Sequence, residues 1–546
     1  MSDPRDIDVL ILGAGINGAG LFRDLCEQGI TCAIIDKGDF GSGTSAAPSR
    51  LIHGGIKYLE TGELRLVAQS TLERNLLLRN APHYVKPLPT VIPIFSWLRG
   101  IPAAIRTLFG STTAPRARGA VLIQIGLLLY DLYGRRARIM PRHRLWSRQR
   151  ALAEIPPLTP RIVAAGTYHD AFVTHPERLV LELVQDGLAA HPASVAMNYA
   201  TLAGTDGDRI DVTGPDGRAL SFRPRIVINA AGPWIDAVNR QLGLETRLIG
   251  GTKGSHILLD HPALIRALDG RMIYFEADDG RICLVYDYLG RALVGSTDIR
   301  ASDPDDLRCE DDEIDYFLES LRNLLPGLDF DRRQIVSVYS GIRPLPRSDG
   351  TAAGLISRDH SAPVAEPAGA RRWPVISLVG GKWTTFRGFA EEVADAVLDR
   401  LGRKRIVSTR ALPIGGGRNF PADPTAWAAA RAGSIPAARW LALLDRYGTR
   451  AEAVALAEAK HGGPAEGDAW SPGEIVWIAR HDRVVHLADI VLRRTPLALT
   501  GSLSLADLRR IAEIAGTELG WGPDHVTTEI ESTRALLAAR YRVVLY

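Results

Sequence analysis

The sequence has few cysteines and lacks a long apolar run. Its four cysteines, Cys26, Cys32, Cys283 and Cys309, form no C-x-x-C pair, so we expect reduced structural thiols in a reducing compartment and no metal site. The longest uncharged apolar stretch, residues 120–130, has 11 residues, whereas a membrane-spanning helix needs about 20. The apolar run after residue 6 is too short for a signal peptide. We therefore expect neither a transmembrane segment nor a secretory leader.

Charge of one sign is also not in excess. The chain of 546 residues has 65 Lys and Arg against 62 Asp and Glu, a net charge of +3. This balance gives no global attraction to nucleic acid, so we expect no nucleic-acid partner. Hydrophobic residues make up 46% and charged residues 23%, which is typical of a globular protein. The length predicts two or three domains.

Residues 7–55 are typical of a dinucleotide-binding unit. An apolar run enters G-A-G-I-N-G at residues 13–18, a helical pattern follows, and a second apolar run ends at Asp36. Gly13 allows the tight turn, Gly15 lets the backbone approach a pyrophosphate, and Gly18 lets helix and strand pack closely. Asp36 is placed to accept hydrogen bonds from the adenosine ribose. A glycine-rich structural turn is the alternative.

The loop after Asp36 is rich in glycine and hydroxyl groups and ends in L-I-H-G-G at residues 51–55. A solvated loop is one interpretation, but the two glycines after His53 favour close approach of a planar group to the backbone. Residues 225–234 form an apolar strand that breaks into A-A-G-P-W. These small residues suit a strand that returns to the nucleotide-binding sheet and leaves room for a cofactor. A purely structural turn is the alternative, because it would have a similar sequence.

A third segment, residues 375–387, combines a strand, two glycines, Lys382 and a helix that opens near Thr384. A helix N-terminus preceded by a lysine stabilises an anion. In a flavin enzyme that anion would be the reduced isoalloxazine ring.

Residues 99–150 carry eleven arginines against one acid, Asp131, on either side of the apolar stretch. This composition favours an element that lies in a bilayer interface with its arginines at anionic head groups. The alternative is a basic excursion that covers a core helix.

The remaining chain divides into a strand-rich part and a helical part. Residues 195–222 alternate as a small meander, and residues 247–339 are mostly strands with a helix at 311–325. Residues 415–417 and 421–424 read as a linker. His481, His486, Arg493 and Arg494 are interpreted as surface or docking residues. The predicted C-terminal helices are 437–447, 451–460, 472–481, 487–493, 504–519 and 523–541.

Together the motifs resemble those of the FAD-dependent glycerol-3-phosphate dehydrogenases. The shared motifs, in order, are G-A-G-I-N-G-A-G, T-S-A-A-P-S-R-L-I-H-G-G-I-K-Y-L-E, I-N-A-A-G-P-W, K-G-S-H, G-S-T-D, Y-S-G-I-R-P-L and G-G-K-W-T-T-F-R. The resemblance covers nearly the full chain. It implies an α/β fold: a Rossmann-like FAD-binding domain of the glutathione-reductase/D-amino-acid-oxidase type, a mainly β substrate domain and a C-terminal α-helical domain. The implied boundaries are a core at 1–410, with FAD-binding parts at about 1–90, 160–235 and 350–410 and substrate or membrane-facing parts at about 91–159 and 236–349, then helices at 411–546.

The resemblance also implies a reaction and its residues. The enzyme would oxidise sn-glycerol 3-phosphate to dihydroxyacetone phosphate with FAD and pass electrons to a membrane quinone, at the cytoplasmic face of the plasma membrane. Catalytic roles fall to His256 as general base, Arg343 and Lys382. The substrate-binding residues are Lys57, Tyr58, Thr297, Arg343 and Arg358. The cofactor-binding residues are Gly13, Gly15, Asn17, Gly18, Asp36, Thr44, Ser45, Arg50, Leu51, His53, Gly54, Ala230, Gly232, Lys382, Thr384 and Thr385.

Two departures and several alternatives stay open. Lys57 stands where related sequences often have arginine, which weakens a bidentate phosphate contact there. Residues 46–48, A-A-P, replace a more serine-rich loop, so these three positions have no side-chain hydroxyl group to contact FAD. A glycerol-3-phosphate oxidase that reduces O2 and a dinucleotide-binding protein without turnover are the alternative functions, and a homodimer is an option that the sequence leaves undecided.

Overall fold

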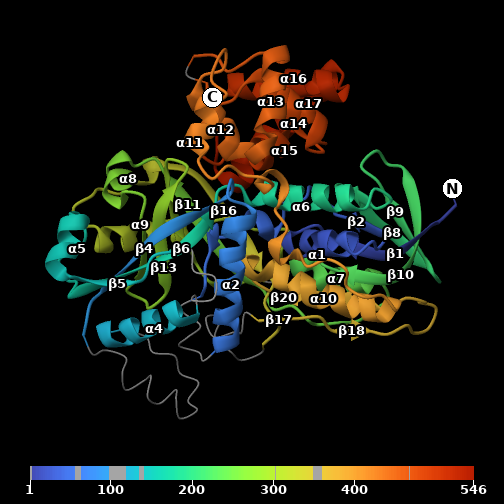
Figure 1. The fold of residues 1–546 in the computed structure, drawn as a ribbon, viewed down its shortest axis with the longest axis horizontal. Coiled ribbons are helices and arrows are strands. Elements are labelled where there is room, and N and C mark those ends of the chain that lie inside the picture. Colours follow the sequence, from blue (N-terminus) through green and yellow to red (C-terminus); the bar gives the residue numbers. More distant parts are fainter. Residues whose placement is uncertain are drawn as a thin grey trace, which may run out of the picture.

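Two large sheets and a helical C-terminal domain make up the fold (Figure 1). The computed structural model describes residues 3–55, 63–97, 119–133, 140–301, 303–348, 359–466 and 468–546. The α/β architecture and the helical C-terminal domain confirm the predicted fold class.

The first sheet is the nucleotide-binding one. Its central strand β1 (Arg5–Leu12) lies between β10 (Ala219–Asn229) and β2 (Cys32–Ile35), and all three run parallel. Leu12 is in register with both Ile35 and Asn229, so the carboxyl ends of the strands meet at one edge. In parallel α/β sheets this edge is where ligands bind. The flanking strands are β7 (Val195–Met197) beside β2, and β19 (Val375–Ser377) and β18 (Val364–Ala365) beyond β10, with the hairpin β8 (Thr201–Asp206) and β9 (Arg209–Thr213) as predicted for the meander.

Three helices cover this sheet. Helix α1 (Ile16–Glu27) packs against α6 (Pro176–Ala190) and α10 (Phe386–Leu401). Helix α10 begins two residues after the predicted start and ends, as predicted, at Gly402, which has a φ of +68°. The strands between these helices are buried on both faces, which explains their unbroken apolar sequence.

The second sheet has ten strands and holds most of the predicted β domain. Two of its strands, β4 (Val85–Ile94) and β6 (Ala164–Val173), pair over their whole length. Strand β4 crosses the boundary expected at about residue 90, and β6 lies inside the expected FAD-binding part at about 160–235 although it pairs with β4 in the second sheet. An extended strand pairs where its register allows and not where composition changes. The other strands are β3 (Leu51–Ile52), β5 (Arg144–Ser147), β11 (Thr252–Leu259), β12 (Met272–Glu276), β13 (Ile282–Tyr288), β14 (Arg291–Gly295), β15 (Ile299–Arg300) and β16 (Ile335–Arg343).

Helices surround the second sheet. The predicted helix at 311–325 is α9 (Asp311–Leu324), and the apolar stretch forms α4 (Ala120–Tyr133). In Figure 1, α4 lies at the edge opposite to the C-terminal domain. Among the described helices, each is too short or too polar to cross a bilayer. The remaining helices here are α2 (Leu64–Asn80), α5 (Arg148–Glu154) and α8 (Pro262–Leu268), whereas the short helix α7 (Ile235–Gln241) packs against β8 and β10 of the first sheet.

The C-terminal domain has its own apolar core, and a closely packed turn connects it to the rest of the chain. The predicted linker at 415–417 is instead a 3-10 turn, in which a Cβ on Gly416 would collide with the backbone of Tyr447. The expected helix at 487–493 is one α turn, α15 (Leu487–Asp489), followed by a π turn at Ile490–Arg494. The other helices are α11 (Pro424–Ala429), α12 (Ala437–Tyr447), α13 (Ala451–His461), α14 (Pro472–His481), α16 (Leu505–Leu519) and α17 (Pro523–Tyr541).

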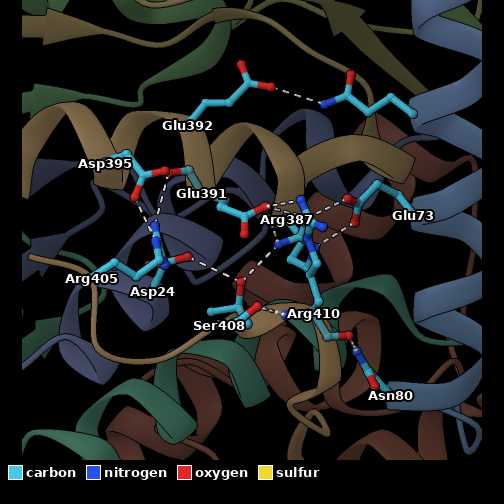
Figure 2. A network of polar contacts seen from close by, with 12 residues as sticks. Asp24, Glu73, Asn80, Arg387, Glu391, Glu392, Asp395, Arg405, Ser408 and Arg410 are labelled. Atoms are coloured by element: carbon cyan, nitrogen blue, oxygen red, sulfur yellow. Dashed lines mark hydrogen bonds and ion pairs between the residues drawn. The ribbon is translucent and has the colours of Figure 1, made fainter.

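A polar network ties α10 to α2 and α1 (Figure 2). Arg387, in the first turn of α10, donates to both carboxylate oxygens of Glu73 on α2, at 2.6 and 2.9 Å. Arg405, which follows α10, pairs with Asp24 of α1 at 2.8 Å and with Asp395 at 2.6 Å. The network therefore fixes the start of α10, and with it the segment that carries Lys382.

Candidate active site

A cavity of about 920 Å³ is lined by residues from both large sheets. It opens at the carboxyl ends of β1, β2 and β10 and extends to β11, β16 and the start of α10. This volume is far larger than a three-carbon phosphate requires and lies in the upper range of cofactor sites. The predicted site residues that line it are Gly13, Gly15, Asn17, Asp36, Thr44, Ser45, Leu51, His53, Ala230, Gly232, His256, Arg343, Lys382 and Thr384.

The glycine turn between β1 and α1 forms one end of the cavity. Gly13 has a φ of +106°, and a Cβ there would lie 2.6 Å from the Ala230 carbonyl oxygen. A Cβ on Gly18 would collide with the Gly13 carbonyl, so Gly18 serves packing and does not line the cavity. The side chain of Asn17 leaves its buried Oδ1 without a hydrogen-bond partner among the described residues. The bare backbone and this buried acceptor fit a bound dinucleotide.

Asp36 lies at the nucleotide end. Its carboxylate accepts hydrogen bonds from the backbone amides of Ala14 at 2.6 Å and Gly38 at 2.9 Å. Burial raises the pKa of Asp36 to about 6, although these two amides oppose the shift. Asp36 lines the cavity at the carboxyl end of β2, and its ribose-binding role stays a prediction.

Lys382 lies at the other end, before the 3-10 turn Trp383–Thr385 that leads into α10. The side chain is buried, and Nζ donates to Ser70 Oγ of α2 at 3.1 Å. The backbone amide of His53 donates to Thr384 Oγ1 at 3.2 Å, which joins the L-I-H-G-G loop to the same turn. The helix N-terminus and the lysine cation together suit an anion. Ser70 was not predicted, because it lies on α2, far from Lys382 in sequence.

His256, on β11, forms a pair with a residue that the sequence did not single out. Its Nε2 lies 2.8 Å from Ser49 Oγ, and its ring stacks on Tyr339 with the centroids 4.8 Å apart. Burial holds the pKa of His256 well below its usual value, and the nearby cations Arg343 and Arg50 lower it further. The imidazole is therefore neutral near neutral pH and able to accept a proton.

Arg343, at the end of β16, brings a cation to the same region. Its guanidinium group donates to Ser296 Oγ at 2.9 Å and to the Thr297 carbonyl at 3.2 Å, and it lies 3.3 Å from Asp298 Oδ1. Ser296 and Asp298 also line the cavity and were not predicted as site residues, although the G-S-T-D motif contains them. These contacts orient the guanidinium plane.

Other predicted residues are turned away from the cavity lining. Arg50 is buried against Glu177, with its NH2 3.0 Å from Oε1, whereas its neighbours Ser49 and Leu51 line the cavity. Thr297 donates to Glu313 at 2.7 Å and accepts from the Ser255 amide at 2.9 Å. Arg50 and Thr297 therefore lie behind the cavity wall and do not line the cavity themselves.

Gly54 and Thr385 also lie outside the lining. The Gly54 amide donates to Asp170 Oδ1 at 3.1 Å, and Thr385 is buried at the start of α10. Lys57, Tyr58 and Arg358 lie outside the described residues.

The fold and the cavity define a flavin-dependent oxidoreductase. Residues 8–396 match the family model "FAD dependent oxidoreductase", and residues 407–526 match the "C-terminal domain of alpha-glycerophosphate oxidase". The chain belongs to the glycerol-3-phosphate dehydrogenase/oxidase family of flavoenzymes, and its cofactor is FAD.

Named relatives agree with this assignment, and a solved structure has the same fold. A glycerol-3-phosphate dehydrogenase of Synechocystis sp. is 32% identical over 96% of this chain and 95% of its own length. Glycerol-3-phosphate dehydrogenase 1 of Mycobacterium tuberculosis is 30% identical over 91% of this chain and 93% of its own. The structure of the Bacillus halodurans glycerol-3-phosphate dehydrogenase has a TM-score of 0.75 at 22% identity and covers 99% of this chain and 96% of that one.

Proposed function

We propose that this enzyme oxidises sn-glycerol 3-phosphate to dihydroxyacetone phosphate. The observation that carries the proposal is the arrangement of a neutral histidine, His256, and two cations, Arg343 and Lys382, in one cavity with the dinucleotide turn. A polyol phosphate needs a proton acceptor for its hydroxyl group and cations for its phosphate. The names of the relatives support this substrate.

Each residue has a role that follows from its contacts. Arg343 binds the substrate phosphate, with Lys57, Tyr58 and Arg358 as further ligands expected from the family motifs. His256 accepts the proton of the C2 hydroxyl, and Ser49 keeps Nε2 oriented. Lys382 and the N-terminal turn of α10 provide positive potential where negative charge develops. Bound FAD supplies the two-electron acceptor for the hydride that leaves C2.

Anaerobic mixing with substrate tests the reaction. The purified holoenzyme should lose its flavin absorbance when sn-glycerol 3-phosphate is added without oxygen, and the enantiomer sn-glycerol 1-phosphate is the control. A flavin that stays oxidised in both cases would refute the proposed activity and leave FAD binding unaffected.

We further propose that the electrons pass to a membrane quinone, at the cytoplasmic face of the plasma membrane. The support is α4, which exposes Val121, Ile125, Leu128 and Leu129 along one face, next to the exposed Trp97. An apolar helix face within the arginine-rich segment 99–150, with arginines on both sides of it in the sequence, suits a bilayer interface. Enzyme reduced by substrate should therefore be reoxidised faster by a quinone analogue than by air-saturated buffer.

An O2-reducing oxidase is the alternative, and the family description of residues 407–526 supports it. Faster reoxidation by O2 would favour this alternative.

Liposome flotation tests the membrane part separately. Leu128→Glu should reduce the floating fraction on vesicles with anionic lipid. Leu456→Glu is a matched control, because Leu456 is 73% exposed but lies in the C-terminal domain. Equal flotation of wild type and the Leu128 variant would refute the α4 interface.

A further inference from the structure

The loop that carries Asp36 is held from outside the nucleotide-binding sheet. Asp39, three residues after Asp36, is completely buried. Its carboxylate accepts hydrogen bonds from Arg494 at 2.6 and 2.8 Å and from Arg493 Nε at 2.6 Å. Both arginines belong to the π turn Ile490–Arg494 of the C-terminal domain. The sequence suggests surface or docking residues; the Arg494 side chain is completely buried, and the Arg493 side chain is 10% exposed.

The contact of Asp39 with Arg493 and Arg494 is a buried charge cluster, unlike an isolated ion pair on the surface. Arg494 binds both oxygens of Asp39 in the bidentate geometry that arginine favours. Burial alone would raise the pKa of Asp39, but the charges of Arg494 and Arg493 outweigh it and lower the pKa to about 2. The carboxylate is therefore ionised at any working pH.

A second set of contacts reaches Asp36 through β7. Asn198 donates to Asp39 Oδ1 and to the Arg483 carbonyl, both at 3.0 Å, and the Tyr199 hydroxyl donates to Asp489 at 2.5 Å. The adjoining backbone then holds the loop: the Asp36 amide donates to the Met197 carbonyl at 3.0 Å. The Ala200 amide donates to the Asp36 carbonyl at 2.8 Å, and the Tyr199 amide donates to the Gly38 carbonyl at 2.9 Å. The C-terminal domain thus contacts both segments that hold Asp36, the one that follows β2 and the one that follows β7.

Buried ion pairs add little net stability compared with apolar packing, yet they fix geometry because a displaced charge has no substitute partner. Because this charge cluster lies three residues from Asp36, it also fixes the position of the loop that carries Asp36. We propose that Arg493 and Arg494 are positioning residues of the cofactor site, through which the C-terminal domain holds the Asp36–Gly38 turn against the adenosine end of FAD. The inference concerns cofactor retention, and it is independent of the substrate and of the electron acceptor.

The rate of FAD release from the diluted holoenzyme, followed by flavin fluorescence, tests this role. Arg494→Lys keeps the charge but loses the bidentate contact, and it should accelerate release by about tenfold or more. Arg480→Gln is the matched control, because Arg480 pairs with Glu518 in the C-terminal domain and is exposed. It should leave the release rate at the wild-type value.

A double-mutant cycle separates positioning from general destabilisation. If Arg494 acts through Asp36, then Arg494→Lys should accelerate FAD release much less in an Asp36→Asn background than in the wild type. Equal acceleration in both backgrounds would overturn the proposal, as would a release rate within twofold of wild type for Arg494→Lys. Should Arg494→Lys fail to fold, Asp39→Asn takes its place in the same cycle with the same criteria.

Discussion

The hydroxyl oxygen of Ser49 lies 2.8 Å from Nε2 of His256. Ser49 is itself held by its carbonyl, which accepts a hydrogen bond from the Tyr286 hydroxyl at 3.1 Å, and the Tyr339 hydroxyl holds the preceding Pro48 carbonyl at 2.9 Å. Tyr339 also stacks on the imidazole. The proposed base is therefore oriented by one stacked ring, Tyr339, and one hydroxyl group, that of Ser49.

We predict that His256→Asn slows flavin reduction by substrate about 100-fold or more, because the general base is lost. Ser49→Ala should slow it by about tenfold, because the base stays but loses its orientation. Stopped-flow absorbance gives both rates. His261→Asn is the matched control: His261 caps α8 and is buried in the same domain, but it does not line the cavity. An unchanged rate in His256→Asn would remove this residue from the mechanism.

Arg343→Ala should mainly raise the substrate concentration needed for half-maximal rate, by about 30-fold or more, because one charge-assisted phosphate contact is lost. Steady-state kinetics with a dye acceptor separates KM from kcat. Arg332→Ala, at an exposed pair with Asp315, is the control and should change neither constant. A fall in kcat with constant KM would contradict the phosphate-binding role.

FAD affinity should depend on pH through Asp36. Burial raises the pKa of Asp36 to about 6; the Asp39 carboxylate adds to the rise, and the amides of Gly38 and Ala14 and the Lys37 cation oppose it. Below pH 6 the carboxyl group must release a proton to bind the ribose as a carboxylate, so affinity should fall by up to about tenfold per pH unit and level off above pH 7. Fluorescence titration of the apoprotein measures this.

Asp24→Asn is the control for that titration. The pKa of Asp24 is also raised to about 6 by burial, but Asp24 lies under α10 and not at the cavity. This variant should keep the pH dependence, whereas Asp36→Asn should lose it. A pH dependence that persists in Asp36→Asn would assign it to another group.

Lys382→Met should lower the reduction potential of the bound flavin by about 30 mV or more, because the reduced ring loses a nearby cation. Ser70→Ala should shift the potential in the same direction by less, since it removes the 3.1 Å bond that holds Nζ. Equilibration with a reference dye gives the potential. Ser320→Ala removes a serine hydrogen bond on α9, outside the cavity, and should cause no shift.

Local chemistry explains what the sequence could predict. The turn at Gly13, the helix end at Gly402 and the meander depend on residues close in the chain, and the structure contains all three. The pairs Ser70–Lys382 and Asp39–Arg494 join residues more than three hundred positions apart, and no periodicity encodes them. The family resemblance implies Arg50 at the cofactor, but its side chain pairs with Glu177, which belongs to another element.

The Arg387–Glu73 pair should be important for stability (Figure 2). Glu73 is almost completely buried, and burial raises its pKa even though Arg387 opposes the shift. Arg387→Met leaves this carboxylate without its main partner and should lower the free energy of unfolding by about 3–5 kcal/mol. Arg400→Met, on the same helix but at an exposed pair with Glu366, should cost less than about 1 kcal/mol. Urea unfolding of the holoenzyme compares the two.

The double variant Arg387→Met/Glu73→Gln tests the cause of the loss. It should recover part of the lost free energy of unfolding, because Glu73 no longer carries an unpaired charge. Equal losses in the single and double variants would contradict this explanation.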